Sequence, residues 1–424
     1  MKNRKLILKE LFSNDEVSGE WGEELPSETH LLRVRCIRGA DIEEAWLNKL
    51  HSAPTRYIKN KSISKLLKEN DIILEISGGS PTQSTGRAVI ITRQLLQHAK
   101  DPIVCSNFCR TLRVNNQNDP KYVFYSLQNI YRQGVFFNFE GKTTGIKNLD
   151  LKSALKSIPI IYLDFPTQQK IAAVLSALDA KIELNQRINA ELESMAKTLY
   201  DYWFVQFDFP NEKGKPYKSA GGKMVWNEAL KREIPLGWDI QKLNSIFDFQ
   251  KGIEPGSAEY RSAPITSDYI KFFRVGDVDG NTEIYVDATN RDFTIVAERD
   301  VVVTFDASVG KTAFGLNGAI SGGFRKIYDR KGKFDNALVY FIFKDERILA
   351  TIHKYATGSI LLHASGSIKH LLIVFDEDIV IQFQVFVKPV FDKMVLNRIE
   401  SQTLTKLRDW LLPMLMNGQV AVMG

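Results

Sequence analysis

The stretch DFPTQQKIAAVLSALDAKIELNQRINAELESMAKTLYDYWF, from Asp164 to Phe204, has the apolar spacing of a long amphipathic helix. The end of the chain repeats it as DEDIVIQFQVFVKPVFDKMVLNRIESQTLTKLRDWLLPMLMNG, from Asp376 to Gly418. A shift of 212 positions places Asn185 on Asn397 and keeps both stretches in register. The chain therefore consists of two half-proteins, each a globular region followed by a long helix. Such a pseudo-twofold chain suits a target with two separated parts.

Both helices carry an apolar seam at alternating steps of four and three residues, and both seams turn polar at the same place, Asn185 and Asn397. A polar seam residue costs stability but fixes register and partner. The pattern favours pairing of the two helices as a coiled coil, and an ordinary core helix in each half is the alternative. We expect Pro389 to bend the second helix or delay its start. The predicted pairing residues are Ile171, Leu175, Leu178, Ile182, Asn185, Leu192 and Leu199 in the first helix and Phe383, Val387, Val390, Met394, Asn397, Leu404 and Leu411 in the second.

The composition excludes several classes of protein. The 424 residues are 44% hydrophobic, which supports two or three domains with real cores. The longest apolar runs are too short to span a membrane, and the N-terminus lacks the apolar segment of a signal peptide. Cys36, Cys105 and Cys109 are too few for a disulfide scaffold and lack histidine partners at zinc spacing. We therefore expect a cytoplasmic protein without a metal site or a membrane contact.

The positive charge is unevenly distributed. The chain carries a net charge of +6, and residues 1–160 hold 24 Lys and Arg against 17 Asp and Glu. Residues 236–375 hold 17 of each. The basic first region is consistent with a polyanionic partner. The second region would need a local patch to bind nucleic acid.

The two globular regions share an order of motifs. NDIILEIS, residues 70–77, is typical of a strand and precedes the loop GGSPTQSTGR, residues 78–87. RDVVVTF, residues 299–305, is likewise followed by DASVGKTAFG, residues 306–315. Upstream of each long helix, TTGIKNL, residues 143–149, matches SGSIKHL, residues 365–371. Glycine and hydroxyl loops that carry a cation suit close approach to phosphates and groove edges, although solvated turns have the same composition.

Motifs for catalysis are missing from the sequence. ASVGKT, residues 307–312, resembles the end of a phosphate-binding loop, but Phe305 stands where its first glycine is required. We find no Rossmann fingerprint, HExxH, GxSxG, methyltransferase core or nuclease carboxylate cluster, and the six histidines are scattered. We therefore predict no catalytic residues, and the chain is interpreted as a binding or targeting subunit.

Three long stretches carry a family resemblance. KTLYDYWFVQFDFPNEKGKPYKSAGGKMVWNEALKREIPLGW, residues 197–238, resembles the central conserved region of type I restriction–modification specificity subunits. RDWLLPMLMNGQV, residues 408–420, resembles the end of their second conserved region, and LDFPTQQKIAAVLSALDAKIE, residues 163–183, the start of the first. The globular regions match by motif order alone, as the variable recognition domains of this family would.

The resemblance implies an α+β fold with two α/β target recognition domains, each followed by a long helix, and the two helices pairing as an antiparallel coiled coil with a pseudo-twofold repeat. The expected divisions are residues 1–160 for the first recognition domain, 161–210 for the central helix, 211–236 for a connector, 237–375 for the second recognition domain and 376–424 for the C-terminal helix.

The resemblance also implies a division of labour. Each recognition domain would read one half of a bipartite, asymmetric double-stranded DNA site, and the helices would set the gap. Two modification subunits would carry S-adenosylmethionine and adenine methylation, and restriction subunits would add ATP- and Mg-dependent translocation and cleavage, so this chain itself would bind no cofactor. The predicted DNA-binding residues are Arg56, Lys59, Lys61, Ser80, Gln83, Arg87, Lys142, Thr143, Thr144 and Lys147 in the first domain and Lys251, Arg274, Ser308, Lys311, Arg325, Ser365, Ser367 and Lys369 in the second.

Two other classes of protein remain as alternatives. One is a self-contained DNA methyltransferase or nuclease with a recognition repeat, which would need a cofactor pocket. The other is a coiled-coil adaptor that does not bind DNA, against which the basic first region and the cation-bearing loops count.

Overall fold

The computed structural model describes residues 5–13, 16–78, 83–143, 146–359, 361–420 and 422, without the side chains of Lys142 and Thr143. The chain forms two compact units. The first unit is Met1–Glu183 with Thr403–Gly424, and the second unit is Leu184–Gln402. Both boundaries fall inside the long helices, so each unit contains part of both. Among the described residues, no helix combines the length and apolarity that crossing a membrane requires.

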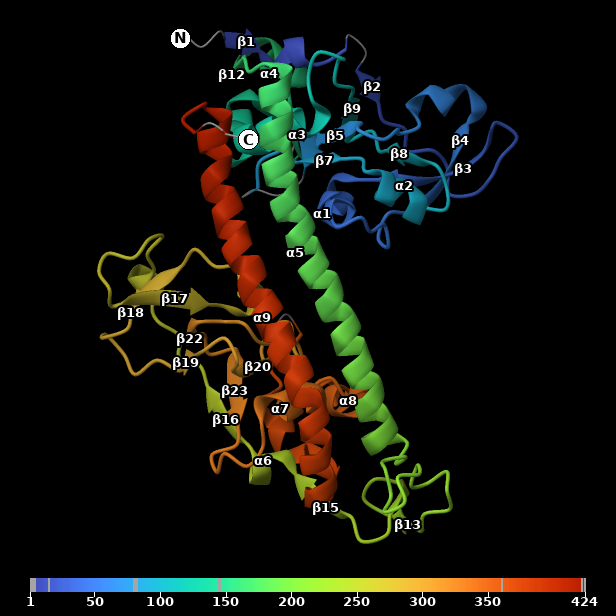
Figure 1. Cartoon of the computed structure of the whole chain (residues 1–424), viewed down its shortest axis with the longest axis vertical. Helices are drawn as coiled ribbons and strands as arrows, with labels where there is room; N and C mark the ends of the chain where they lie inside the picture. The colour runs from blue at the N-terminus through green and yellow to red at the C-terminus, as the bar shows by residue number, and fades with distance from the viewer. Residues whose placement is uncertain are drawn as a thin grey trace. The chain divides into compact units, whose positions relative to one another are not determined.

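The first unit combines two main sheets with short helices (Figure 1). One sheet has the order β2-β9-β5-β7 and the other the order β4-β3-β8. β3 pairs antiparallel with β4 and parallel with β8. The strands are β1 (Lys5–Ile7), β2 (Val17–Ser18), β3 (His30–Ile37), β4 (Thr55–Lys59), β5 (Ile72–Glu75), β6 (Ser77–Gly78), β7 (Ala88–Ile90), β8 (Ile103–Cys105), β9 (Cys109–Leu112), β10 (Glu140–Thr143), β11 (Ile146–Leu149) and β12 (Pro159–Ile161), and the short helices are α1 (Ile42–Trp46), α2 (Arg93–His98), α3 (Pro120–Arg132) and α4 (Leu151–Ser157).

The second unit repeats the topology of the two main sheets and adds β19 to the edge of one of them. Its sheets have the orders β16-β23-β20-β21 and β18-β17-β22-β19, with β17 antiparallel to β18 and parallel to β22. β15 pairs with β24 as β1 pairs with β12. The strands are β13 (Met224–Asn227), β14 (Arg232–Pro235), β15 (Asp239–Lys242), β16 (Asp248–Lys251), β17 (Tyr269–Phe273), β18 (Tyr285–Asp287), β19 (Ile295–Val296), β20 (Val301–Thr304), β21 (Thr312–Ala313), β22 (Gly318–Ile320), β23 (Phe324–Tyr328) and β24 (Leu372–Phe375), and the short helices are α6 (Leu243–Ile246), α7 (Asn336–Ile342) and α8 (Glu346–Lys354).

The two predicted long helices are confirmed as α5 (Phe165–Tyr200) and α9 (Glu377–Met416). An aspartate caps each start: Asp164 accepts a hydrogen bond from the Thr167 backbone N–H at 2.8 Å, and Asp376 accepts one from Ile379 at 3.0 Å. A π-helical turn, Asp201–Val205, continues α5. The expectation that Pro389 delays the second helix is wrong, because α9 begins at Glu377 and continues through the proline.

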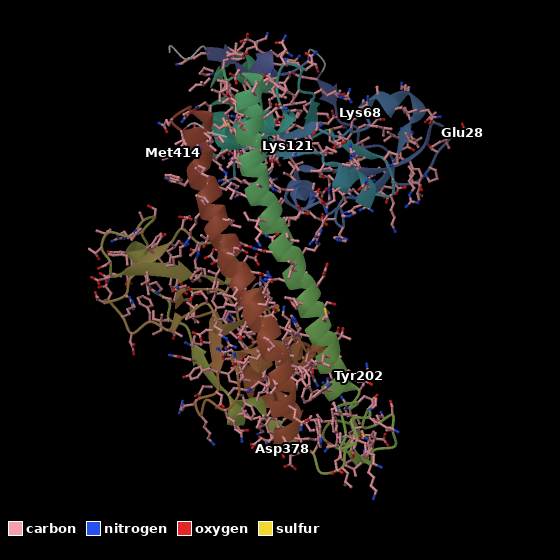
Figure 2. The ribbon with its side chains drawn as sticks, viewed as in Figure 1. Glu28, Lys68, Lys121, Tyr202, Asp378 and Met414 are labelled. Atoms are coloured by element: carbon pink, nitrogen blue, oxygen red, sulfur yellow. The ribbon has the colours of Figure 1, made fainter. Side chains whose placement is uncertain are left out.

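In the second unit, α5 and α9 run antiparallel and share a buried polar layer. Asn185 and Asn397 are each 1% exposed. Asn397 donates to Asn189 Oδ1 at 2.8 Å, Asn189 donates to the Met394 carbonyl at 2.9 Å, and Asn185 donates to Glu400 at 2.7 Å. Higher numbers on α5 thus meet lower numbers on α9. In Figure 2, Asp378 at the start of α9 lies at the same end of this pair as Tyr202, just beyond α5.

In the first unit, the same two helices meet through an ion pair. Arg408 of α9 contacts Asp179 of α5 at 2.7 Å, with both side chains at most 15% exposed. Tyr125 of α3 donates a 2.6 Å hydrogen bond to the other oxygen of Asp179. The Arg408 guanidinium also lies over the Trp46 ring. This cluster fastens both helices to the globular part of the unit.

Apolar seam residues fill the space around these polar contacts. The structure buries Ile171, Leu175 and Ile182 on α5 and Phe383, Val387 and Met394 on α9, and it half-buries Leu178, Leu192, Leu199, Val390, Leu404 and Leu411. In the first unit, Ile171 and Leu175 belong to the same apolar cluster as Leu412 and Leu415. The specific pairing role of each residue stays a prediction.

Replacing Asn397 by alanine should destabilise the second unit. The change removes the side chain of Asn397, which is 1% exposed and donates to Asn189 Oδ1, and losing a buried hydrogen-bond partner costs about 1–3 kcal/mol. Urea unfolding and hydrogen exchange of α9 measure the loss. Gln186→Ala, at an exposed position of α5, is the matched control. Equal stability of the two variants would contradict the polar layer.

Replacing Asp179 by leucine should destabilise the first unit by about 2 kcal/mol or more, because Arg408 and the Tyr125 hydroxyl lose a shared buried partner. The double variant Asp179→Leu with Arg408→Met should recover part of the loss, since an apolar pair replaces an ion pair at low cost. Hydrogen exchange of α3 reports the stability. If the double variant loses as much free energy of unfolding as Asp179→Leu and Arg408→Met lose together, the two residues are not coupled.

Candidate nucleic-acid interface

In the first unit, several loops meet where strands end. β3 and β8 are parallel, so their carboxyl ends share one edge of the sheet. The Ser106 N–H donates to the Ile37 carbonyl at 2.9 Å, and the Glu20 N–H donates to the Cys105 carbonyl at 2.8 Å. The N–H groups of Ile76 and Ser77 both donate to the Phe108 carbonyl. We call the segments 18–20, 38–41, 75–78, 83–87 and 106–110 the first loop cluster.

The second unit has the same arrangement. The Ser321 N–H donates to the Phe273 carbonyl at 2.9 Å, as Ser106 does to Ile37. The Ile253 N–H donates to Ile320 at 3.0 Å, and the Phe305 N–H donates to Gly323 at 2.8 Å. We call the segments 251–253, 274–277, 304–311, 321–325 and 361–365 the second loop cluster.

Arginine contacts are repeated in both clusters. Arg38 bonds the Asp41 carboxylate through its N–H and its guanidinium, each at 2.9 Å. Arg274 bonds Asp277 in the same way, at 2.9 and 3.3 Å. The hydrogen bonds to Asp41 raise the pKa of Arg38. In both units, the carboxylate holds the arginine side chain and the loop backbone in place.

A second repeated arginine supports the tight turn that follows β8 or β22. Arg110 Nη1 donates to the Asn107 and Cys109 carbonyls at 3.0 and 2.9 Å. Arg325 Nη1 donates to the Gly322 and Phe324 carbonyls, both at 2.8 Å. Arg325 is 5% exposed, and its other nitrogen donates to Ser365 Oγ at 2.6 Å. This arginine is therefore a scaffold of the cluster.

The structure distributes the predicted residues of the first domain over several environments. Arg87 binds Glu75 with two hydrogen bonds of 2.9 and 2.8 Å, which raise the pKa of Arg87, so this charge is used inside the cluster. Arg56 is 8% exposed, pairs with Glu24 and stacks on Trp21. Lys61 and Gln83 are exposed, and Lys59 and Lys147 are half-buried. Ser80 and Thr144 lie outside the described residues, as do the side chains of Lys142 and Thr143.

In the second domain, the surface of the cluster carries more of the predicted residues. Lys251, Arg274, Ser308, Lys311 and Ser365 are all exposed members of the second loop cluster. Lys369 is exposed outside it, and Ser367 is fully buried and donates to the Ala364 carbonyl. Within the described residues, the second cluster thus brings three exposed cations together with two hydroxyl groups.

One sequence match between the halves is wrong as a structural equivalence. Residues 146–149 form strand β11, whereas Ser365–His370 is a 3₁₀ helix. Asn148 pairs with Ser77 as His363 pairs with Asp306, so the counterpart of β11 ends at residue 364. The first half then inserts α4, and the second half inserts the 3₁₀ helix. Because the inserted segments differ, SGSIKHL aligns in sequence with residues of β11, to which it is not structurally equivalent.

The stretch ASVGKT does not form a phosphate-binding loop. Residues 305–311 connect β20 directly to the antiparallel strand β21. A phosphate-binding loop leads into a helix whose N-terminus faces the phosphates. Lys311 instead lies exposed on the second loop cluster.

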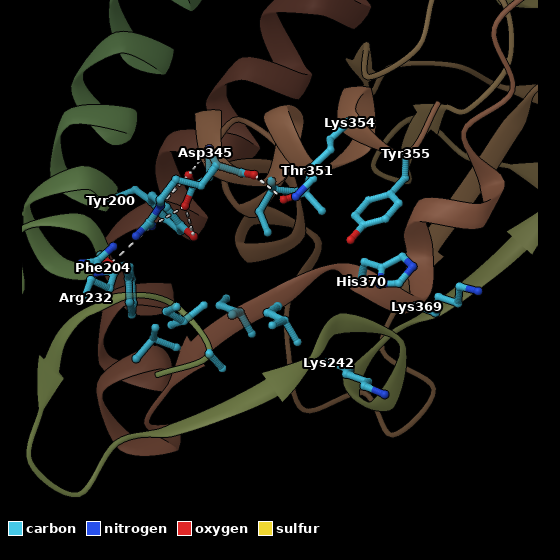
Figure 3. A pocket seen from close by; sticks show the side chains of 17 residues that line it. Tyr200, Phe204, Arg232, Lys242, Asp345, Thr351, Lys354, Tyr355, Lys369 and His370 are labelled. Carbon is cyan, nitrogen blue, oxygen red and sulfur yellow. Dashed lines mark hydrogen bonds and ion pairs between the residues drawn. The ribbon is translucent and has the colours of Figure 1, made fainter. Parts of the chain in front are cut away.

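A cavity of 690 Å³ in the second unit lies apart from the loop cluster (Figure 3). Asp345 and two arginines lie near the end of α5: Arg232 donates to the Val205 carbonyl at 2.7 Å, and Arg347 donates to Phe204 at 3.4 Å and to Asp345. Cations are favoured at the carboxyl end of a helix, so these charges are structural. Tyr355 stacks on His370 at the other end of the cavity.

The cysteines have a structural environment as well. Cys36, Cys105 and Cys109 are buried and free. Burial raises the pKa of Cys36 to about 12, which keeps the thiol neutral. The described residues contain no cluster of His, Cys, Asp or Glu that could hold a metal ion.

Sequence reasoning missed Arg38, Asp41, Phe108 and Arg110, which belong to the first loop cluster. Their signal was present as two short internal matches. RGADI, residues 38–42, matches RVGDV, residues 274–278, and SNFCR, residues 106–110, matches SGGFR, residues 321–325. Each match is too short to be recognised without the strand pairing that aligns it.

Comparisons with known proteins agree with this architecture. The family described as "Type I restriction modification DNA specificity domain" matches residues 48–194. The specificity subunit of the type I restriction enzyme MjaIX of Methanocaldococcus jannaschii is 25% identical over 76% of this chain and 74% of its own length. The specificity subunit of the HindI enzyme of Haemophilus influenzae is 22% identical over 63% of this chain and 70% of its own length.

One solved structure supports the fold. The S subunit of a type I restriction–modification system from M. genitalium matches with a TM-score of 0.52 at 16% identity, covering 97% of this chain and 96% of that one. The predicted fold class, two α/β regions each followed by a long helix, is confirmed. The repeated topology, the paired long helices and the matching relatives lead to one conclusion: over most of its length this chain is similar to the DNA specificity (S) subunits of type I restriction–modification systems, which are the non-catalytic subunits of these complexes.

Proposed function

We propose that this specificity subunit recognises a bipartite, asymmetric DNA site, with the first loop cluster reading one half-site and the second loop cluster reading the other. The observation that carries the proposal is the duplicated loop frame. The same backbone hydrogen bonds hold both clusters, whereas the exposed side chains differ. One scaffold used twice with different surfaces suits two half-sites of different sequence.

The chemistry of the exposed residues fits both parts of DNA recognition. Lys251, Arg274 and Lys311 can contact phosphates, which position a duplex without reading its sequence. Gln83, Ser308 and Ser365 carry the amide and hydroxyl groups that read base edges in the major groove. Arg56, Arg325 and Ser367 are engaged inside the protein, so we assign them to support of the clusters rather than to direct contact.

The long helices supply the spacing in this proposal. α5 has 36 residues and α9 has 40, and residues of both helices belong to both units. A helix rises about 1.5 Å per residue, so its length converts into a fixed number of unread base pairs, in the way that dimer geometry sets half-site spacing in other DNA readers.

The partners follow from the non-catalytic role. We assign adenine methylation and S-adenosylmethionine to two modification subunits that dock on the helical regions. ATP-driven translocation and Mg-dependent cleavage belong to restriction subunits. The specificity subunit binds no cofactor of its own and works in the cytoplasm, where the DNA is.

Alanine at Lys251 or Lys311 should weaken binding to all DNA sequences alike and should reduce the slope of log K against log salt by about 1 per lost phosphate contact. Binding of the assembled methyltransferase complex to labelled duplexes at several salt concentrations measures this. Lys331→Ala is the matched control, because Lys331 is exposed beyond the opposite end of β23. An unchanged salt slope in both cluster variants would show that this face does not contact DNA.

Exchange of one recognition domain should rewrite one half-site only. Replacing residues 1–160 with the corresponding region of a related subunit should change one half of the methylated sequence, because the second loop cluster is untouched. Sequencing of adenine methylation in the host reads out both half-sites and the gap. The reciprocal exchange of residues 237–375 is the control. A single exchange that alters both half-sites would refute the modular reading and the proposed domain borders.

A further inference from the structure

Phe108 stands out in the first loop cluster. It lies in the turn between β8 and β9, and its side chain is 55% exposed. Its own carbonyl accepts the N–H groups of Ile76 and Ser77, so the backbone at this position is fixed. An aromatic ring thus projects from a rigid turn toward solvent.

The equivalent position in the second unit is Gly323. Ser106 and Ser321 donate to equivalent strands, and the turns that follow close with the same hydrogen bond, from Cys109 to Ser106 and from Phe324 to Ser321, each at 3.0 Å. The backbone therefore takes the same path with and without the aromatic ring. Folding of the turn does not require Phe108.

A reciprocal change of size accompanies this difference. Val275 occupies the place of Gly39, and a Cβ on Gly323 would lie 2.4 Å from the Val275 Cγ2. In the first unit, residue 39 is glycine, and a Cβ there would lie 2.3 Å from Glu75 Oε1. The first unit thus combines Gly39 with Phe108, whereas the second unit combines Val275 with Gly323 at the equivalent positions.

The surroundings of Phe108 are polar and partly cationic. It lines a depression of 290 Å³ together with Arg38, Gln83, Ser84 and Arg87, and the Arg87 guanidinium is paired there with Glu75. The Arg38 side chain is 38% exposed. Single exposed apolar side chains are common on protein surfaces. Here, however, the ring stands beside Gln83, which the proposed function places against DNA, and beside Arg38, the counterpart of Arg274.

We propose that Phe108 is a wedge that inserts between two stacked base pairs of the first half-site, and that the second half-site is bound without such a wedge. This inference rests on the proposed function. Apolar side chains inserted at a base step unstack it and bend the duplex, and pyrimidine–purine steps yield most easily. Phe108 therefore adds a preference for a deformable step in one half-site, and the two halves of the site are distorted unequally.

The test uses the complex of this chain with its modification subunits and the duplex defined by the methylated sequence. 2-Aminopurine, which fluoresces when unstacked, replaces one purine at a time in each half-site. We expect a rise of several-fold at one step of the first half-site, besides the signal at the methylated adenine, which methyltransferases extrude. Phe108→Ala should abolish the first signal, keep the second and weaken binding by about 5- to 100-fold. Phe108→Leu should retain part of the fluorescence rise in the first half-site and part of the binding affinity that Phe108→Ala loses.

Leu31→Ala is the control, because Leu31 is an exposed apolar residue of β3 outside the loop cluster, and it should leave both signals and the affinity unchanged. A Phe108→Ala complex with the wild-type fluorescence profile and affinity overturns the wedge while leaving the proposed function intact. A wild-type complex that fails to prefer its methylated sequence over unrelated DNA overturns the proposed function and, with it, the wedge.

Discussion

The parallel pairing of β3 with β8, and of β17 with β22, determines where the loops of each loop cluster meet. Parallel strands end at the same edge of a sheet, so the loops after them must meet. In both units, a serine N–H after the second strand closes onto the last carbonyl of the first strand at 2.9 Å. The remaining loops of each cluster are then fixed by hydrogen bonds to these two segments.

This arrangement separates support from recognition. Carboxylates and buried arginines hold the loops through contacts such as Arg38 to Asp41 and Arg325 to Ser365. The exposed side chains between these contacts are not needed to hold the loops in place. Side chains there can change from Phe108 in one unit to Gly323 in the other while the backbone keeps its path. A scaffold of this kind allows the recognised sequence to change without a new fold.

The long helices were the part of the fold that sequence could predict best. Their seams follow the heptad period over many turns, and Asn185 and Asn397 interrupt them at positions related by the repeat, where the structure has a buried polar layer. The strands before the two glycine-rich loops were also predicted correctly as β5 and β20. In both cases the signal is local and repeated along the chain.

The loop clusters were harder to predict, because their members meet through strand pairing. The sequence gives no indication that Arg56 stacks on Trp21 or that Arg325 supports a turn, since a buried arginine and an exposed one look the same. The insertion of α4 between β11 and β12 also displaced the alignment of the two halves, so that Lys369 was matched to Lys147 of β11 although it lies in a 3₁₀ helix.

The central claim, one loop frame used once for each half-site, can be tested by photo-crosslinking. A duplex with 5-iodouracil in one half-site at a time is bound to the assembled complex, and the crosslinked peptides are identified by mass spectrometry. The account predicts crosslinks from one half-site to residues of the first loop cluster, such as Gln83 and Phe108, and from the other half-site to residues of the second, such as Ser308 and Lys311. Crosslinks from both half-sites to the same cluster would contradict it.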